Sequence, residues 1–298
     1  MTGIHHLKLA DRGLITVGGP DRKSFLQGLI SNDIELVSQQ QAIWAALLTA
    51  QGKYLHDFFI IEIGDIYYLD CEAARLMDLG QRLSRFKLRA AVELEIAEDF
   101  HVWAAFGKNV PALMGGNQVP GAAVRRDGGA VYCDPRLTDM GARAVLSFES
   151  ATALWTELNA RSGSAEEYDI LRISLGLPDG SRDMAIEKAI LLENNFDLLN
   201  GIAWEKGCYV GQELTARTKY RGLVKKRLIP VKVSGRAPQI GTPVTVDGRE
   251  AGEVRSSAGN MALALLRLEQ MEKAKVAGIS LLSGDTVLTP HLPEWQRI

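Results

Sequence analysis

The sequence predicts a mixed α+β fold followed by an all-β C-terminal region. In residues 92–96, apolar side chains alternate with glutamates, which is the period of a half-exposed strand. In residues 72–86, leucines recur at the three- and four-residue spacing of one helical face. After Arg227 the pattern changes to short β-rich runs between glycine and Asp-Gly turns, which is typical of a small antiparallel barrel.

The first hundred residues predict one αβ unit. Gly18-Gly19-Pro20 ends a first strand, and Asp21 is placed to cap the helix that follows. Gln51-Gly52 is a turn signal between two apolar runs, which predicts a hairpin. The elements expected here, in chain order, are a strand at 14–17, a helix with apolar positions within 25–30, strands at 42–50, 54–62 and 66–70, a helix at 72–86 and a strand at 92–96.

A second αβ set and the β-rich tail follow. Residues 107–129 are rich in glycine, so only short strands are expected there, and residues 177–192 read as a long loop of the kind that often carries function. Gly176 is well placed to follow a helix end. The elements expected are strands at 102–106 and 142–147, helices at 151–161 and 165–175, and short strands at 228–233, 244–246, 252–255, 262–268 and 287–289.

Composition limits the classes of protein. The chain has 298 residues, 46% of them hydrophobic and 23% charged, with a net charge of −2. These values predict a folded chain of two or three domains with no global attraction to nucleic acid or membranes. No apolar run approaches the roughly 20 residues of a membrane-spanning helix. Met1–Asp11 shows neither a signal-peptide core nor a transit-peptide pattern.

The cysteine pattern indicates a reducing compartment. Cys71, Cys133 and Cys208 are far apart and odd in number, which argues against a disulfide framework. No Cys-x-x-Cys and no Cys/His cluster occurs, so no resident zinc site is expected. Together with the first eleven residues, this pattern predicts a cytoplasmic protein.

The most informative segment is Lys206-Gly207-Cys208-Tyr209-Val210-Gly211-Gln212-Glu213. Glycines on both sides allow the cysteine to lie on a sharp turn. The neighbouring lysine could favour the thiolate, which is the reactive and metal-binding form of the side chain. The alternative is a small buried hydrophobic cysteine, as most free cysteines are.

The same segment carries a resemblance. It is followed by Leu-Thr-Ala-Arg, and further matching patches lie on both sides of it in the expected order; they are residues 25–33, 51–57, 193–196, 200–202, 221–222 and 226–231. The chain from about Leu14 to Val231 therefore resembles the YgfZ family, which comprises iron-sulfur assembly factors related to the T-protein (aminomethyltransferase) of the glycine cleavage system.

The resemblance implies a three-domain, aminomethyltransferase-like α+β fold around a central opening. Ferredoxin-like αβ units would be followed by a C-terminal antiparallel β-barrel. The implied domains are residues 1–98 with part of 165–227, residues 99–164, and residues 228–298.

The resemblance also implies a function. The chain would be a tetrahydrofolate-binding accessory factor that assembles or repairs iron-sulfur clusters, chiefly [4Fe-4S], without conventional turnover. Its partners would be A-type cluster carriers and client enzymes, including radical enzymes that modify tRNA. Cys208 would be the reactive residue and a transient ligand. One thiolate cannot hold a cluster alone, since clusters usually need four ligands, so any cluster would be shared.

The implied folate-binding residues are Asp57, Glu193, Asn195, Lys206, Gln212, Glu213 and Arg221. Gln212 and Glu213 could read a pterin edge through paired donor and acceptor groups, or could hold the cysteine turn or cap a helix after Gly211. The basic run from Lys206 to Arg227 could attract a polyglutamylated folate tail or RNA, although charge runs are usually solvated surface.

Two departures from the related aminomethyltransferases leave rival functions open. Where those enzymes have two adjacent acids on one strand, this chain has His56 and Asp57. Where they have a glutamate two residues after the arginine that matches Arg172, this chain has Ser174. Both changes argue against aminomethyl transfer, which remains the first alternative. The second alternative is an RNA-binding accessory factor for tRNA modification that uses Arg217–Arg227.

Overall fold

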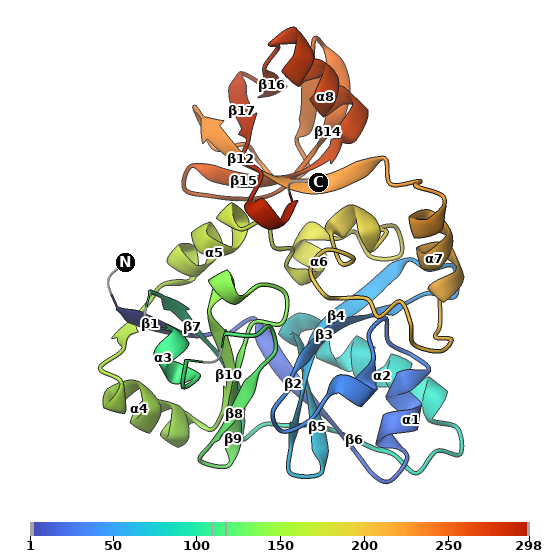
Figure 1. Cartoon of the computed structure of the whole chain (residues 1–298), viewed down its shortest axis with the longest axis vertical. Coiled ribbons are helices and arrows are strands. Elements are labelled where there is room, and N and C mark those ends of the chain that lie inside the picture. The colour runs from blue at the N-terminus through green and yellow to red at the C-terminus, as the bar shows by residue number, and fades with distance from the viewer. Residues whose placement is uncertain (1–2, 109, 117, 297–298) are drawn as a thin grey trace. The chain divides into compact units, whose positions relative to one another are not determined.

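Two sheets and a closed barrel make up the β-structure of the chain (Figure 1). A computed structural model describes residues 3–108, 110–116 and 118–296. Contacts divide the chain into two units: unit 1 (residues 1–48, 55–165 and 199–212) and unit 2 (residues 49–54, 166–198 and 213–298). Within the described ranges, no helix is long and apolar enough to cross a membrane.

The first sheet of unit 1 has the strand order β3-β4-β5-β2-β6. Its strands are β2 (Arg12–Gly18), β3 (Ile43–Leu48), β4 (Tyr54–Ile63), β5 (Ile66–Glu72) and β6 (Glu93–Ile96). Helices α1 (Arg22–Gln27) and α2 (Leu76–Lys87) cover one face. Strand side chains such as Phe58, Ile60 and Leu69 join Leu26 and Leu79 of the helices in one buried core. The predicted hairpin and helices of this region are confirmed.

The second sheet of unit 1 has the order β11-β1-β7-β10-β9-β8. Its strands are β1 (Ile4–Lys8), β7 (His101–Gly107), β8 (Ala123–Arg126), β9 (Gly129–Cys133), β10 (Ala142–Leu146) and β11 (Arg161–Ser162). Helices α3 (Val110–Leu113) and α4 (Phe148–Glu157) accompany it, and Leu154 and Trp155 of α4 pack into its core. β1 was not among the predicted strands. It pairs antiparallel with β7 and parallel with β11.

A buried cluster of charges joins the two sheets of unit 1. Asp70 of β5 accepts hydrogen bonds from Arg12 of β2 at 2.7 Å and from Arg143 of β10 at 2.6 Å. All three side chains are almost fully buried. The Arg143 guanidinium lies 4.0 Å from the ring centroid of Phe59 on β4. Buried ion pairs contribute less to stability than their strength suggests, because desolvation opposes them, but their geometry is specific.

Unit 2 contains the closed barrel, with the order β12-β15-β14-β13-β16-β17. Its strands are β12 (Lys226–Ser234), β13 (Pro243–Val246), β14 (Arg249–Ala258), β15 (Met261–Arg267), β16 (Leu281–Ser283) and β17 (Thr286–Pro290). Every pairing is antiparallel, and register shifts mark β13 and β14. Inward-facing residues such as Val231, Val254 and Leu266 form its core.

The sequence pattern predicted an all-β tail, but the tail also contains a helix. Helix α8 (Leu268–Ala277) lies between β15 and β16, and Ala274 is buried in the barrel core. Its sequence is rich in glutamate, lysine and alanine, which are strong helix formers. Lys273 pairs with Glu269 one turn earlier.

Helices α5 (Ala165–Ser174), α6 (Gly180–Asp183) and α7 (Gln212–Tyr220) complete the architecture. In unit 2, buried Arg172 of α5 donates to Asp183 of α6 at 2.7 Å and to Ser256 of β14 at 3.2 Å. The carboxylates of Asp183, Asp179 and Asp169 raise the pKa of Arg172 and outweigh the opposing effect of burial, which is the largest single influence. Arg172 thus ties α5 to the rest of the unit.

Candidate functional site

The cysteine loop, residues 199–211, runs beside residues 28–32 of unit 1. The backbone amide of Ala203 donates to the carbonyl of Ser31 at 3.1 Å, and the amide of Val210 donates to the carbonyl of Gly28 at 3.1 Å. The Ser31 hydroxyl donates to the carbonyl of Gly201 at 2.7 Å. Val210 also packs against the core under the first sheet. The loop therefore has a fixed path although it is neither helix nor strand.

Lys206 holds the middle of this loop. Its side chain is buried, and its ammonium donates to the backbone carbonyls of Ile30 at 2.9 Å and Asn32 at 2.6 Å. The ammonium also lies 5.2 Å from the ring centroid of buried Tyr209. Burial lowers the pKa of Lys206 to about 8, against a smaller opposing effect of Asp33. From the sequence, we expected the positive charge of Lys206 to favour the Cys208 thiolate. In the structure, the ammonium instead anchors the loop through these two hydrogen bonds.

Cys208 is exposed, whereas the other two cysteines are buried. Cys71 lies in the core of the first sheet and Cys133 in that of the second. Burial raises the pKa of Cys71 to about 12 and also raises the pKa of Cys133, which keeps both thiols protonated and unreactive. The alternative of a buried core cysteine is wrong. Cys208 lies in irregular backbone just before a turn at residues 210–211, and not on the turn that the sequence predicted.

The glycines on either side of Cys208, Gly207 and Gly211, differ in whether the folded backbone requires glycine. Gly211 has a φ of +81°, in the left-handed region that favours glycine. Gly207 is outside that region, and a Cβ added to it would meet no atom within 4 Å. The folded chain therefore requires glycine at 211, but its own packing does not require glycine at 207. The space beside Cys208 stays open.

Asp57 is buried on β4, with 4% of its surface exposed. Its Oδ2 accepts a hydrogen bond of 3.0 Å from the indole nitrogen of Trp44 on β3. The guanidinium of Arg136 lies over the rings of Trp44 and Phe59, at 5.6 and 4.9 Å. Arg136 is itself held by two hydrogen bonds to Asp134, at 2.9 and 2.7 Å. A carboxylate, two aromatic rings and a guanidinium thus gather in unit 1.

Trp44 and Arg136 were not predicted as site residues. Counting outward from the turn at Gln51-Gly52 places Trp44 opposite Phe59, two residues from Asp57 on the neighbouring strand. The hairpin register could therefore have placed Trp44 near Asp57. Arg136 lies in the irregular segment after β9, and no periodic pattern indicates its position.

His56 points away from Asp57, because successive side chains of a strand face opposite ways. Its Nε2 lies 2.8 Å from Asp78 Oδ2 and 3.3 Å from a nitrogen of Arg75. Burial, followed by the nearby Arg75, lowers the pKa of His56 to about 4. The histidine is therefore neutral near pH 7, and it packs β4 against α2.

Glu193 and Asn195 lie in unit 2. Asn195 is fully buried in the left-handed conformation, and its amide donates to the carbonyl of Leu228 at 2.8 Å. Nearby, the guanidinium of Arg227 donates a 2.6 Å hydrogen bond to the carboxylate of Asp197. Burial raises the pKa of the half-buried Glu193, against the opposing charge of Lys226 and other bases. The folded chain gives Asn195 backbone partners, and its predicted role in folate binding stays a prediction.

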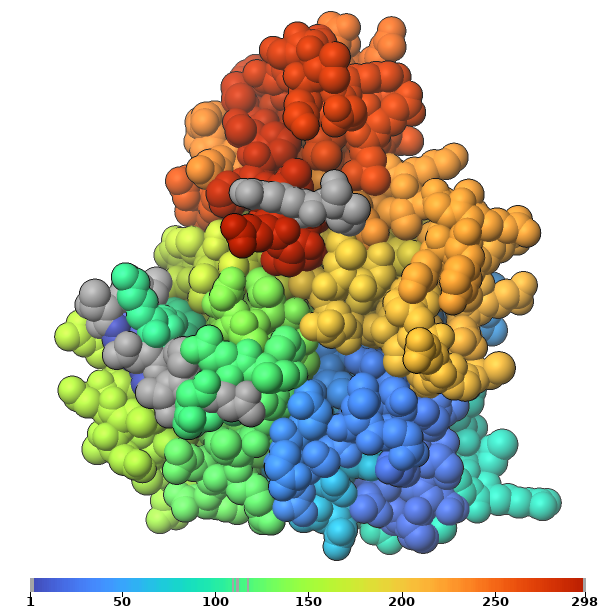
Figure 2. Space-filling view, in the orientation of Figure 1, coloured from blue at the N-terminus to red at the C-terminus, as the bar shows by residue number. Residues whose placement is uncertain are grey.

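Gln212 and Glu213 open α7, where a carboxylate in the first turn suits the helix dipole. Arg221 follows the helix and is exposed. The other exposed bases of this segment are Arg217, Lys219 and Lys225. Figure 2 shows this segment, coloured orange, on the surface. These exposed bases are therefore solvated, whereas Lys206 and Arg227 at the two ends of the run are not. The predicted ligand roles of Gln212, Glu213 and Arg221 stay predictions.

Ser174 stands where the related aminomethyltransferases have glutamate, according to the sequence resemblance. Its hydroxyl donates to the carbonyl of Leu171, one turn earlier, at 2.7 Å. This hydroxyl satisfies the backbone of α5 and carries no charge. It therefore supplies no carboxylate for a substrate ring.

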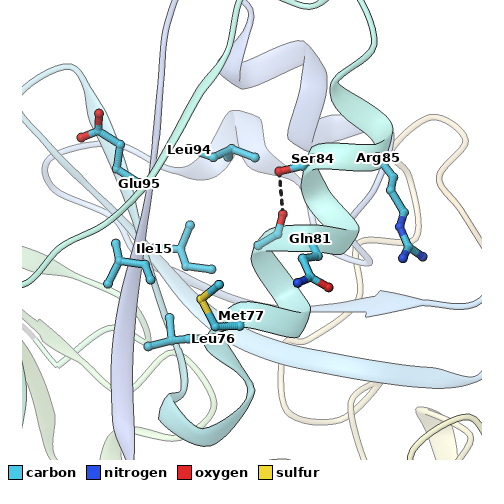
Figure 3. A pocket seen from close by; sticks show the side chains of 10 residues that line it. Ile15, Leu76, Met77, Gln81, Ser84, Arg85, Leu94 and Glu95 are labelled. Atoms are coloured by element: carbon cyan, nitrogen blue, oxygen red, sulfur yellow. Dashed lines mark hydrogen bonds between the residues drawn. The ribbon is translucent and has the colours of Figure 1, made fainter.

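A cavity of about 410 Å³ separates α2 from strands β2 and β6 in unit 1. Leu76 and Met77 lie across it from Ile15 (Figure 3). The Ser84 hydroxyl is bonded to the carbonyl of Gly80 at 2.8 Å, and Arg85 extends from the far side of the helix. Sites for small ligands usually combine apolar walls with a few convergent polar groups. This groove lacks such convergence, and we assign no function to it.

A cluster cannot be held by one chain at this site. Among the described residues, no group of three or more histidine, cysteine, aspartate or glutamate side chains is arranged to bind a metal. The geometry instead offers one accessible thiol on a loop anchored by buried hydrogen bonds. Such a site can supply one ligand or one nucleophile to a molecule that brings the remaining groups.

The fold is that of the aminomethyltransferases. The crystal structure of glycine cleavage system aminomethyltransferase T from Bartonella henselae superposes with a TM-score of 0.78, at 17% identity, over 99% of this chain and 88% of that one. The family model "CAF17, C-terminal beta-barrel domain" matches residues 225–298. The predicted α+β fold with a C-terminal antiparallel barrel is confirmed, and the three-domain boundaries stay a prediction.

Sequence similarity is more specific than the fold. The chain is 33% identical to the mouse protein named iron-sulfur cluster assembly factor IBA57, mitochondrial, over 97% of this chain and 84% of that protein. It is 32% identical to the human protein of the same name, with the same coverage. The chain belongs to the IBA57 family, which confirms the resemblance to YgfZ-type assembly factors.

The comparison also corrects the predicted location. The relatives are named as mitochondrial proteins, so the prediction of a cytoplasmic protein is wrong. Three separate cysteines indicate a reducing compartment but do not distinguish one such compartment from another.

Proposed function

We propose that this chain is an iron-sulfur cluster assembly factor that offers the Cys208 thiolate as one ligand of a cluster shared with a partner protein. The observation that carries the proposal is the accessible Cys208 on a loop held by buried Lys206. Family membership supports the assembly role. Because iron-sulfur clusters usually take four protein ligands, the partner must supply the others. The cluster is cargo and not a resident cofactor.

The partners in this proposal are A-type cluster carriers and the client enzymes that receive [4Fe-4S] clusters. The space beside Gly207 allows a partner backbone to come close to the thiol. The loop has no need to reorganise, because its backbone and Lys206 are already bonded. Rigid presentation of this kind lowers the entropy cost of association.

The test is transfer of a cluster in vitro. An A-type carrier loaded with its cluster is mixed with the full chain, and the visible circular dichroism of the cluster is followed together with the mass of the complex. The wild type is expected to give a new spectrum and a joint complex. Cys208→Ala is expected to give neither, while Cys133→Ala, which removes a buried thiol, retains both. A joint cluster spectrum from Cys208→Ala would refute the proposal.

We further propose that unit 1 binds tetrahydrofolate beside Asp57. A carboxylate can accept hydrogen bonds from a pterin ring, and the indole of Trp44 and the guanidinium of Arg136 lie close to Asp57. The side chains present therefore fit the group in kind. Bound tetrahydrofolate would supply an electron-rich ring, and Asp57 would orient it.

Calorimetric titration of tetrahydrofolate tests this second proposal. Asp57→Asn preserves the shape and an acceptor for Trp44, so it is expected to fold and to bind about tenfold more weakly, since a hydrogen bond to a charged group contributes roughly 1.5–3 kcal/mol. Asp247→Asn, an exposed turn residue of the barrel, is the matched control. Absent binding by the wild type, or equal binding by Asp57→Asn, would refute the folate site and leave the Cys208 proposal untouched.

The same preparations separate the rival functions. Transfer of an aminomethyl or formaldehyde group to tetrahydrofolate would favour an enzyme of the aminomethyltransferase type. Salt-dependent binding to RNA that is lost on charge reversal of Arg217 and Arg221 would favour an RNA-binding factor. The solvated basic run is the only observation on the described residues that favours the latter.

A further inference from the structure

A cavity of about 560 Å³ in unit 1 is lined by residues outside the cysteine loop and the Asp57 cluster. His6 and Lys8 of β1, Trp103 of β7, and Phe148 and Trp155 of α4 line it. β1 and β7 are neighbours in the second sheet, so residues nearly a hundred positions apart meet here. Nothing in the proposed cluster transfer uses this cavity.

Its walls are aromatic. The rings of His6 and Trp155 stack with centroids 5.2 Å apart and planes within 7°. Trp103 lies 6.0 Å from Phe148 and 6.4 Å from Trp155. Phe148 is 61% exposed although it is a large apolar ring. A flat ligand could cover Phe148 and gain the offset or edge contacts that aromatic rings prefer.

Two hydrogen-bond donors in these walls lack partners. Trp103 and Trp155 are 6% and 3% exposed, and neither indole nitrogen finds an acceptor among the described residues. The Nδ1 of His6 is likewise buried without a partner there. Buried polar groups in folded proteins are nearly always hydrogen-bonded, and leaving one unpaired costs roughly 1–3 kcal/mol. Three such groups are enclosed within the walls of this cavity, and the described residues supply no acceptor for them.

The charges of the lining residues indicate which kind of ligand the cavity favours. Lys8 lines it and makes no ion pair within the part of the chain that the structure describes. No carboxylate lines it among the described residues. Burial lowers the pKa of His6, so its ring is neutral near pH 7. One free positive charge with no opposing acid favours an anion.

The geometry points to a binding site for a small aromatic anion. The ring of the ligand packs against Phe148 and the tryptophans, and its carboxylate or phosphate pairs with Lys8. Such a ligand satisfies the aromatic and electrostatic features of the cavity at once. The site is independent of Cys208 and of Asp57.

The probe for this site is 2-naphthoate, titrated by calorimetry into the full chain. Binding is expected for the wild type and for Lys232→Gln, an exposed lysine of the barrel. Lys8→Gln, which changes an exposed residue, is expected to fold normally and to weaken binding about tenfold. In ¹H–¹⁵N spectra, the indole N–H signals of Trp103 and Trp155, assigned through their phenylalanine variants, are expected to shift on binding, because both side chains line the cavity.

Two related compounds complete the test. Naphthalene-2-methanol has the ring without the charge, and cyclohexanecarboxylate has the charge without the ring. Weak binding of both is the expected result. The proposal is overturned if 2-naphthoate does not bind at millimolar concentration, if naphthalene-2-methanol binds equally well, or if Lys8→Gln binds as the wild type does.

Discussion

The ammonium of Lys206 donates a 2.6 Å hydrogen bond to the backbone carbonyl of Asn32, 174 residues earlier in the chain. A second bond reaches the carbonyl of Ile30. The lysine of the cysteine motif therefore fixes the loop from beneath, while Cys208, two residues on, remains exposed. The predicted contact of Lys206 with folate stays a prediction.

Lys206→Met is expected to lower the free energy of unfolding by about 1–3 kcal/mol, because two buried carbonyls lose their donor. Urea denaturation measures the loss, and hydrogen exchange at the Val210 amide reports loosening of the loop. Lys219→Met, on the exposed face of α7, is the control and should change neither quantity. Equal stability of the two variants would contradict the anchoring role.

Gly207→Ala and Gly211→Ala should separate partner contact from folding. At Gly211 the left-handed backbone opposes alanine, so a loss of about 1 kcal/mol of stability is expected. At Gly207 the backbone and the surrounding space accept a methyl group, so stability should stay within about 0.5 kcal/mol of wild type. If the thiol meets a partner closely, Gly207→Ala should nevertheless impair formation of the shared cluster. Full cluster formation by Gly207→Ala would argue against close approach.

His56 should make stability depend on pH below neutrality. Its pKa is about 4 in the folded chain and near 6.5 when unfolded. Between these values the unfolded chain binds more protons, so stability should fall as pH drops from about 6.5 to 4, by up to about 3 kcal/mol. Thermal unfolding of wild type and His56→Gln across this range checks the slope. The slope should be shallower in His56→Gln, and an identical slope would exclude His56 as its source.

Arg143→Met should be costly. It removes one of the two arginines that pair with buried Asp70 and the guanidinium that lies 4.0 Å from the ring of Phe59. Breaking a buried pair costs about 3–5 kcal/mol. Arg267→Met removes an exposed pair with Glu250 and should cost no more than about 1 kcal/mol. Comparable losses in urea denaturation would mean that the buried cluster is not a stabilising link between the sheets.

Much of the fold was predictable because its periodic elements are amphipathic. The leucines of α2 and the alternation in β6 each report one buried face. β1 was missed because its sequence, Ile-His-His-Leu-Lys, has no alternation and its neighbour β7 lies a hundred residues away. α8 was missed because the turn signals around it indicated β-structure.

The site was predictable only where the information is local. Glycines near Cys208 indicate that it lies outside helix and strand, and it does, with its thiol exposed. The partner of Lys206 and the arginine over Trp44 depend on segments that meet only in the folded chain. No spacing in the sequence reports such contacts. The orphan indoles of Trp103 and Trp155 were invisible for the same reason.

The place of β1 has a consequence for how the chain matures. This first-made strand pairs on one side with β7 and on the other with β11, at residues 161–162. During synthesis it must therefore wait, unpaired, for more than ninety residues of later chain. A chain shortened by its first eight residues would leave β7 as an open sheet edge, and such edges recruit other strands. Aggregation of nascent or trimmed molecules should therefore begin at this sheet, and not at the barrel, whose ring of strands leaves no edge open.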